Sequence, residues 1–300
     1  MKEKSRLRRF FRRYGADYAF VAPYTILFTV FSIVPVVMSM GLSLTYFNVL
    51  ETPVFNGISN YLRLFLDDKL FLTAVKNTLL ISVITGPIGF LLSYMLAWLI
   101  SQFNPKLRAF FTLLFYAPSM SGSVYLTWQL ILSNDSHGLL NGFLMSMGFI
   151  QTPILWLQDT KYMLGGAIAM ILWMSLGTSF LSFIAGFMNV DKTLYEAGAI
   201  DGIRNRVQEL WFITLPSMRP QLMFGAVMSI TSSFGVGDII SGIYGFPSTN
   251  YALHTMTHHL QDYGNIRFEM GYASAIATVL FLIMFFTNKL VQKLIGKLGR

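Results

Sequence analysis

The stretch Leu194–Pro220, LYEAGAIDGIRNRVQELWFITLPSMRP, joins two strongly apolar segments, and the way it folds decides what kind of protein surrounds it. Thr193 and Glu196 have the spacing of a capping box, in which two side chains satisfy backbone N–H groups at the start of a helix. Gly202 stands where a glycine commonly ends a helix. The spacing predicts a helix over 194–201, roughly 12 Å long, which is too short to be stable in water without a supporting surface.

A second helix is expected later in the same connection. Its apolar positions recur with helical spacing and are Val207, Leu210, Trp211 and Thr214. This helix should end at Leu215, because the residue before a proline is pushed out of the α region. The connection is thus predicted to be a helix–turn–helix on one face of a membrane. An ordinary interfacial return into the next apolar segment is the alternative.

The composition is that of a membrane protein. Of the 300 residues, 54% are hydrophobic and 12% are charged, against about 25% charged in soluble domains. A transmembrane helix needs ~20 mainly apolar residues. Six segments qualify: Tyr18–Leu44, Phe71–Ile100, Phe110–Leu132, Met163–Met188, Leu222–Ile243 and Met270–Leu290. The sequence therefore predicts an all-α, multi-pass membrane protein with no soluble catalytic domain.

The basic residues give the orientation. An even number of spans puts both termini on one side, and Lys and Arg favour the cytoplasmic side. The opposite side carries only Arg63, Lys69, Lys76, Lys161 and Arg267 of the 22 Lys and Arg residues. Both termini and the quoted connection should therefore be cytoplasmic. The basic N-terminal stretch KEKSRLRRFFRRYG is interpreted as a segment that faces lipid phosphates rather than nucleic acid.

Three parts are expected along the chain. Residues 1–70 hold the N-terminus, the first span and the first external segment; residues 71–290 form a core of five helices with the cytoplasmic connection 189–219; and residues 291–300 form a basic tail. A short interfacial helix is expected to begin at Ser59. The stretch HTMTHHLQD places His254, His258 and Asp262 with helical spacing, which could suit a metal, but a wet external loop without metal is the prediction.

The quoted connection resembles the cytoplasmic EAA loop of permease subunits of ABC importers, whose pattern is Glu-Ala-Ala-x-x-x-Gly followed, after an interval, by Ile-x-Leu-Pro. The matching residues are Glu196, Ala197, Gly202, Ile213, Leu215 and Pro216, and Gly198 replaces the second alanine. FNGISNYLRLF, YAPSMSGSVYLTWQLILSNDSHGLLN and FEMGYASAIATVLFLIMFF are similar to blocks of the carbohydrate branch, the maltose/glycerol-phosphate-type permeases. The resemblance covers most of the chain, about 45–295.

The resemblance implies the type I importer permease fold in a bacterial-type cytoplasmic membrane. It also implies the partners: a second permease subunit, two ATPase subunits that carry ATP and Mg, and an extracytoplasmic protein that delivers a carbohydrate. The chain lacks the G-x-x-x-x-G-K-[ST] phosphate loop, so it is predicted to bind no cofactor and to be non-catalytic. The implied ATPase-coupling residues are Tyr195, Glu196, Ala197, Gly198, Asp201, Gly202, Ile213, Leu215 and Pro216.

Aromatic and polar residues within the spans are candidates for the solute pathway, because sugars are held by aromatic faces and hydrogen bonds. They are Tyr125, Trp128, Gln129, Trp173, Phe234, Asp238 and Tyr244. A carboxylate within a membrane is costly and suggests a functional site, although Asp238 could instead reach interfacial water. For any single tryptophan, a place in an interfacial belt is the favoured interpretation.

Two other functions compete with carbohydrate import. One is an importer permease for another solute, such as phosphate or a peptide, and the blocks of the carbohydrate branch argue against it. The other is a membrane enzyme or an ion-coupled carrier. An enzyme would need a cluster of acid, base or metal-binding groups, and a carrier normally shows paired carboxylates or inverted repeats. Neither pattern is present in the sequence.

Overall fold

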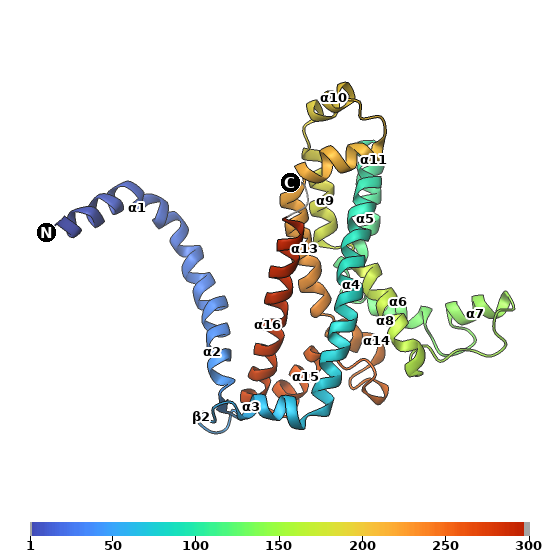
Figure 1. Cartoon of the computed structure of the whole chain (residues 1–300). Helices are drawn as coiled ribbons and strands as arrows, with labels where there is room; N and C mark the ends of the chain where they lie inside the picture. The colour runs from blue at the N-terminus through green and yellow to red at the C-terminus, as the bar shows by residue number, and fades with distance from the viewer. Residues whose placement is uncertain (1, 297–300) are drawn as a thin grey trace.

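Long apolar helices packed side by side form the centre of the computed structural model, which describes residues 2–296 and the side chains from residue 14 onward. The bundle contains α4 (Lys69–Ser101), α8 (Thr160–Met174), α9 (Thr178–Asn189), α13 (Arg219–Phe234) and α16 (Met270–Ile295). Helix α4 contacts α8, α9 and α13, and α13 also contacts α9 and α16 (Figure 1). Apolar side chains from these helices fill its interior, so the all-α prediction is confirmed.

Up to six segments among the described residues could cross a membrane. Four are continuous by length and composition: Tyr14–Leu42, Lys69–Ser101, Thr160–Asn189 and Met270–Ile295. The other two are broken. Helix α5 (Pro105–Met120) meets α6 (Val124–Ile131) at 89°, and α13 meets α14 (Gly237–Tyr244) at 43°. The breaks fall at Ser121–Ser123 and at Gly235-Val236, where small residues interrupt the helices.

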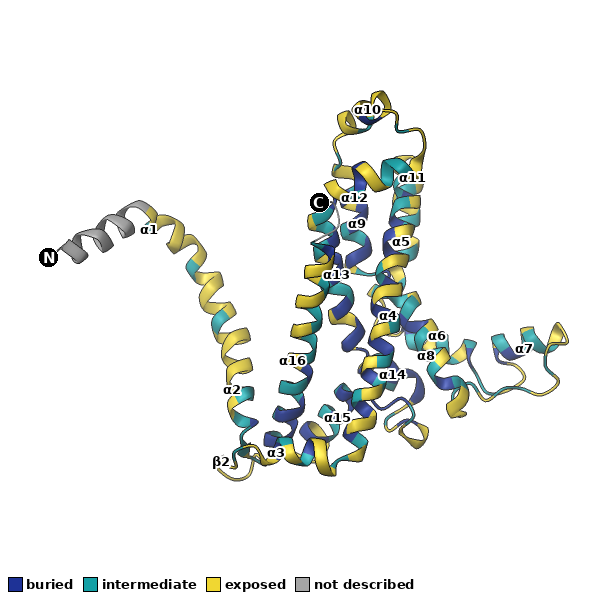
Figure 2. Cartoon of the chain, in the orientation of Figure 1, coloured by how far each residue is buried: buried dark blue, intermediate teal, exposed yellow. Residues whose placement is uncertain are grey.

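The first span stands apart from the bundle (Figure 2). It consists of α1 (Lys2–Phe28), the π-helical turn η1 (Thr29–Ile33) and α2 (Val34–Leu42), and none of its apolar window is buried. Helix α2 contacts α16. The predicted lipid-facing basic stretch before Tyr14 lies outside the described side chains, and residues 297–300 of the predicted tail lie outside the described residues.

Glycines allow the closest helix contacts in the bundle. A Cβ atom added to Gly225 of α13 would lie 2.3 Å from the Phe183 ring of α9. That ring also meets Phe90 and Tyr94 of α4 edge-on. Three helices therefore pack around a single aromatic side chain, and this contact fixes the position of α13, which follows the quoted connection.

At one end of the bundle, short elements form a cap. They are β1 (Thr45–Tyr46), β2 (Val54–Phe55), α3 (Ser59–Leu62), η2 (Arg63–Asp67), η4 (Thr249–Tyr251), α15 (Met256–Gln261) and η5 (Asp262–Ile266); α7 (Leu139–Ser146) projects to one side (Figure 1). The strands pair antiparallel. The predicted interfacial helix begins at Ser59, as expected.

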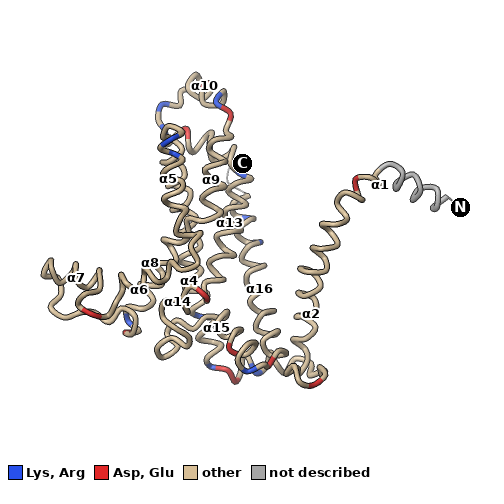
Figure 3. The backbone as a smooth tube through the Cα atoms, turned by 180° about the vertical axis from the view of Figure 1, so that it is seen from behind, with Lys and Arg blue, Asp and Glu red and all other residues tan. Residues whose placement is uncertain are grey.

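The opposite end carries the connection quoted at the start. It consists of α10 (Lys192–Ile200), α11 (Arg206–Glu209), the π-helical turn η3 (Leu210–Thr214) and α12 (Leu215–Ser217). Helix α10 protrudes beyond the bundle, and Lys and Arg positions lie around it and at the start of α5, together with Asp and Glu positions of the same connection (Figure 3). The described part of the C-terminal helix ends near this side (Figure 1).

Candidate functional site

Helix α10 begins two residues earlier than predicted. Asp191, in an extended conformation, caps the helix by accepting a hydrogen bond from the backbone N–H of Thr193 at 3.0 Å. The predicted capping box of Thr193 and Glu196 is therefore wrong. An Asp placed before Thr193 is an equally good cap, and because the helix then includes Thr193, the side chain of Glu196 is left exposed.

The end of α10 is as predicted. Gly202 has φ = +91°, a conformation that residues with a Cβ atom rarely adopt. Its N–H donates to the carbonyl of Ala199, and the N–H of Ile203 donates to the carbonyl of Gly198 at 2.9 Å. This pair of bonds is a Schellman motif, which satisfies carbonyls that a helix end leaves free. Gly202 therefore produces the sharp turn out of α10.

One side of α10 is fixed to η3. The hydroxyl of Tyr195 lies 2.9 Å from that of the buried Thr214. A Cβ atom added to Gly198 would lie 2.6 Å from Cδ1 of Ile213 and 3.0 Å from Cδ1 of Ile203, so the glycine makes room for both isoleucines. Gly198, which replaces the second alanine of the loop pattern, is thus in direct contact with Ile213 from the far end of the pattern.

The predicted second helix does not end at Leu215. The π-helical turn carries the chain through Leu215 and Pro216 to Ser217, with the N–H of Leu215 bonded to the carbonyl of Leu210. Pro216 then lies in the first turn of α12, where a missing N–H is tolerated. The extra residue in the π turn also changes the buried face, because π turns add one residue to the helical repeat.

As a result, the predicted apolar face is only partly buried. Thr214 is buried and Leu210 is half-buried, but Val207 and Trp211 are exposed. Ile213 takes the second buried position in their place.

The other side of α10 is exposed. Leu194 is 44% exposed and Ile200 is 87% exposed. Glu196 and Ala197 lie exposed between them. An apolar side chain such as Ile200, presented beyond the bundle on a short fixed helix, is suited to insertion into a groove of another protein.

Two of the predicted pathway residues line one cavity. Tyr125 of α6 and Asp238 of α14 border a cavity of about 370 Å³, together with Ser119 and Met174. Asp238 is exposed, and its carboxylate accepts a hydrogen bond from the side-chain amide of Gln261 at 2.7 Å. The cavity lies where both broken spans change direction, so its wall is built from the interrupted helices.

None of the remaining pathway candidates is among the residues that line this cavity. Trp128 and Trp173 meet edge-on, 5.7 Å between ring centres. The side-chain amide of Gln129 donates to the carbonyl of Gly242 at 2.8 Å, which ties α6 to α14. Phe234 and Tyr244 are buried in the apolar core.

A second cavity, of about 220 Å³, has a polar lining that the sequence analysis missed. Its hydroxyl-bearing residues are Thr85, Tyr116, Ser119, Ser175, Thr178, Ser179, Ser229, Ser232 and Ser233. Met174 and Ile239 border both cavities, so the two adjoin. The run SITSSF at 229–234 was the signal in the sequence, because repeated hydroxyls within a span indicate a polar surface.

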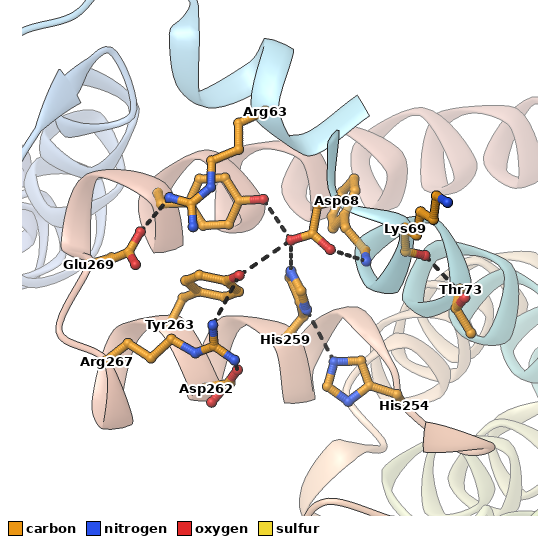
Figure 4. A network of polar contacts seen from close by, with 12 residues as sticks. Arg63, Asp68, Lys69, Thr73, His254, His259, Asp262, Tyr263, Arg267 and Glu269 are labelled. Carbon is orange, nitrogen blue, oxygen red and sulfur yellow. Dashed lines mark hydrogen bonds and ion pairs between the residues drawn. The ribbon is translucent and has the colours of Figure 1, made fainter. Parts of the chain in front are cut away.

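The segment around His254 and His258, predicted to be a wet loop, is instead buried, and His254 belongs to a polar network with His259 and Asp68 (Figure 4). His254, His258 and His259 are 2% exposed or less. Nε2 of His259 lies 3.0 Å from the carboxylate of Asp68, and Nδ1 of His259 lies 3.1 Å from Nε2 of His254. An ionised carboxylate only accepts hydrogen bonds, so His259 donates to Asp68 and accepts from His254.

The pKa values of the two histidines and of Asp68 are all lowered, for different reasons. Burial lowers the pKa of His254 to about 3 and also lowers that of His259, although Asp68 opposes the shift in both. Burial raises the pKa of Asp68, but the Phe71 N–H and the neighbouring side-chain donors lower it overall. The histidines are therefore neutral and the carboxylate is ionised at neutral pH. No group of three or more such side chains among the described residues is arranged to hold a metal ion.

Comparison with known proteins identifies the family. Residues 87–298 match the family described as the binding-protein-dependent transport system inner membrane component. The chain is 32% identical, over 90% of its length and 86% of the relative's, to the probable ABC transporter permease protein YesP of Bacillus subtilis (strain 168). It is 30% identical to the lactose transport system permease protein LacF of Rhizobium radiobacter, over 94% and 93% of the two chains.

A solved structure shares the fold. It is the crystal structure of a bacterial ABC transporter involved in the import of the acidic polysaccharide alginate. Its chain matches with a TM-score of 0.75 and 24% identity over 96% of this chain and 99% of that one. With the protruding α10, the broken spans and the matched residues 87–298, the conclusion is that this chain belongs to the family of inner membrane components of binding-protein-dependent transport systems.

Proposed function

We propose that this chain is one of two permease subunits of an ATP-driven importer and that its solute is a carbohydrate. The observation that carries the proposal is the construction of α10, which is fixed on one side through Tyr195 and Gly198 and exposes Glu196 and Ile200 on the other. A helix of this kind transmits movement only if a partner protein binds its exposed side. The chain belongs to a family of inner membrane transport components, which supports the idea that the movement is passed to the membrane-spanning helices.

The partner at α10 is an ATPase subunit. The full sequence holds no phosphate loop, so ATP and Mg are bound and used by two separate subunits, and this chain is non-catalytic. Glu196 pairs with a basic residue of one ATPase, and Ile200 enters its groove. Lys106, Arg108, Lys192, Arg204, Arg206 and Arg219 belong to the elements at the α10 end of the described structure, and this number of Lys and Arg residues supports a cytoplasmic position for α10 and for both termini.

The movement reaches the solute pathway through a continuous chain of elements. Helix α10 holds η3, which continues through α12 into α13, and α13 leads across the break at Gly235 into α14. Asp238 lies in the first turn of α14 and borders the 370 Å³ cavity. Closure of the ATPases pulls α10 and thereby shifts the wall of that cavity. Each bound state of the ATPases must favour one arrangement for the shift to occur.

A carbohydrate suits the lining of the two cavities. Tyr125 offers a ring face, Asp238 offers a carboxylate acceptor, and the adjoining cavity offers a row of hydroxyls. The printed names of relatives point the same way: a lactose permease from Rhizobium radiobacter and an arabinooligosaccharide permease from Bacillus subtilis (strain 168). The second permease subunit supplies the other half of the pathway, and an external binding protein delivers the sugar at the opposite face.

The test is ATP-driven uptake in liposomes that contain the chain, its partner permease and the ATPase, with the binding protein outside. Radiolabelled lactose and an arabinooligosaccharide are the first solutes to compare with a phosphate and a dipeptide. We expect uptake of a carbohydrate and of neither other solute. Glu196→Lys should lose this uptake. Glu51→Lys is the matched control, because it reverses the charge of an exposed carboxylate at the opposite end of the bundle, and it should keep the uptake. Uptake of only phosphate or dipeptide, or unimpaired uptake by Glu196→Lys, would contradict the proposal.

A further inference from the structure

A third cavity lies beneath α10, outside the proposed solute pathway. Its volume is about 640 Å³, and its walls come from the ends of α4 and α9, the start of α5, and the connection from α10 to η3. Neither the sequence pattern of the loop nor the proposed sugar pathway gives this cavity a role.

The cavity is basic. Arg108, Lys192 and Arg206 line it, and Glu209 is the one carboxylate among its lining residues. Glu209 is already paired with Arg206 at 3.2 Å. Arg108, which is half-buried, and Lys192 form no ion pair or side-chain hydrogen bond with other described residues. Arg108 is partly removed from water without a partner, which is costly, and the exposed Lys192 lines the same cavity from α10. The two cations together therefore favour an anion in the cavity.

The position of the cavity along the length of the bundle indicates what the anion is. Helix α4 ends at Ser101 and α9 ends at Asn189, so the cavity lies at the boundary between the apolar bundle and its water-facing end. Trp98 and Phe187 contribute an apolar wall, and tryptophan is typical of the headgroup level of a bilayer. A lipid phosphate lies at this level, with its tails beside the apolar wall, whereas a free anion gains nothing from that wall.

We propose that this cavity binds the phosphate group of an anionic phospholipid, held between Arg108 and Lys192. Arginine matches phosphate oxygens with two parallel hydrogen bonds, and basic pockets between helices at the cytoplasmic side are suited to anionic headgroups. The lipid links α5 to α10 and so stiffens α10 against the bundle. The binding itself does not depend on the proposed sugar or on the ATPase.

The test measures lipid binding directly. The assembled, delipidated transporter is titrated with phosphatidylglycerol or phosphatidylcholine in detergent and examined by native mass spectrometry. We expect phosphatidylglycerol to bind more tightly, and Arg108→Gln and Lys192→Gln each to weaken it about fivefold, the usual contribution of one basic residue near a membrane surface. Lys106→Gln, two residues from Arg108 and outside the cavity lining, should bind like the native chain.

Several results would overturn the proposal. Equal affinity for the two lipids would show that the site does not recognise the negative charge of the headgroup. Native affinity in both Arg108→Gln and Lys192→Gln would show that the lipid binds elsewhere. Displacement of phosphatidylglycerol by millimolar inorganic phosphate would make the site one for free phosphate rather than lipid. Because the readout is binding, a failure here is separate from a failure of carbohydrate uptake.

Discussion

The hydroxyl of Tyr195 lies 2.9 Å from the hydroxyl of Thr214, and this bond joins α10 to the π-helical turn that leads into α13. In Tyr195→Phe the ring remains but the bond is lost, which should cost ~1 kcal/mol. Local opening of the connection should therefore become about fivefold more frequent. Trypsin cleavage after Arg204 and Arg206, both exposed, measures this opening.

The control is Tyr162→Phe, because the Tyr162 ring packs on Trp156 while its hydroxyl has no hydrogen-bond partner among the described residues. It should be cleaved at the native rate. Equal cleavage rates in both variants would show that the Tyr195 hydroxyl does not hold α10.

Gly202 should tolerate no side chain. Its φ of +91° makes Gly202→Ala costly by ~1–2 kcal/mol, and the strain should loosen the Schellman motif. Hydrogen exchange at the amide of Ile203, which donates to the carbonyl of Gly198, should then accelerate by about tenfold or more. Gly165→Ala is the matched control, since Gly165 is helical and has open space around it. Unchanged exchange in Gly202→Ala would show that the end of α10 adopts another conformation.

Gly198 and Ile213 should be energetically coupled. Alanine at 198 would place a Cβ atom 2.6 Å from Cδ1 of Ile213, so Gly198→Ala must displace that side chain. Ile213→Val removes the clashing methyl at a cost of about 0.5–1.5 kcal/mol. In a double-mutant cycle on the thermal midpoint, we expect the second substitution to offset part of the first, with a coupling energy on the order of 1 kcal/mol. Strictly additive effects would mean that the two side chains do not compete for the same space.

The sequence predicts the elements that depend on composition and on local spacing. Six apolar segments are visible because each is long, and Gly202 ends α10 because only a glycine suits that backbone. The start of α10 could not be decided locally, since Asp191 and Thr193 are both good caps and only the folded chain shows which one is used. The predicted coupling residues follow from a resemblance to a family rather than from chemistry visible in the loop.

Other features depend on contacts between distant parts of the chain. His259 looks like a residue of an external loop because its acceptor, Asp68, lies 191 positions earlier. The turn η3 adds a residue to the helical repeat, and no residue type marks that addition in advance. The cavity of Tyr125 and Asp238 arises where two broken spans meet, which requires the positions of both. Sequence reasoning found these two side chains but not their common cavity.

The histidine network should make the protein less stable in mild acid. In the folded state Nδ1 of His259 accepts from His254, and Nδ1 of His258 accepts from the backbone N–H of Thr255. Protonation of Nδ1 would turn this acceptor into a donor, which would then face the N–H donor of His254 or of Thr255. Burial lowers the pKa of each histidine below its value of 6.5 in the unfolded chain, so the unfolded state takes up protons first. Stability is therefore complete above pH 6.5 and falls as the pH decreases toward about 3, the pKa of His254.

The expected loss is up to about 1.4 kcal/mol per pH unit for each buried histidine. The thermal midpoint of the purified chain, measured between pH 7.5 and pH 5, should fall, and His254→Gln should flatten that fall, because it removes one of the buried histidines whose pKa is lowered. His137→Gln, at the exposed fourth histidine, should leave the slope unchanged. A slope in His254→Gln equal to that of the native chain would show that this network does not unfold with the transition being measured. The comparison uses the slope because loss of the His254 ring contacts lowers the midpoint at every pH.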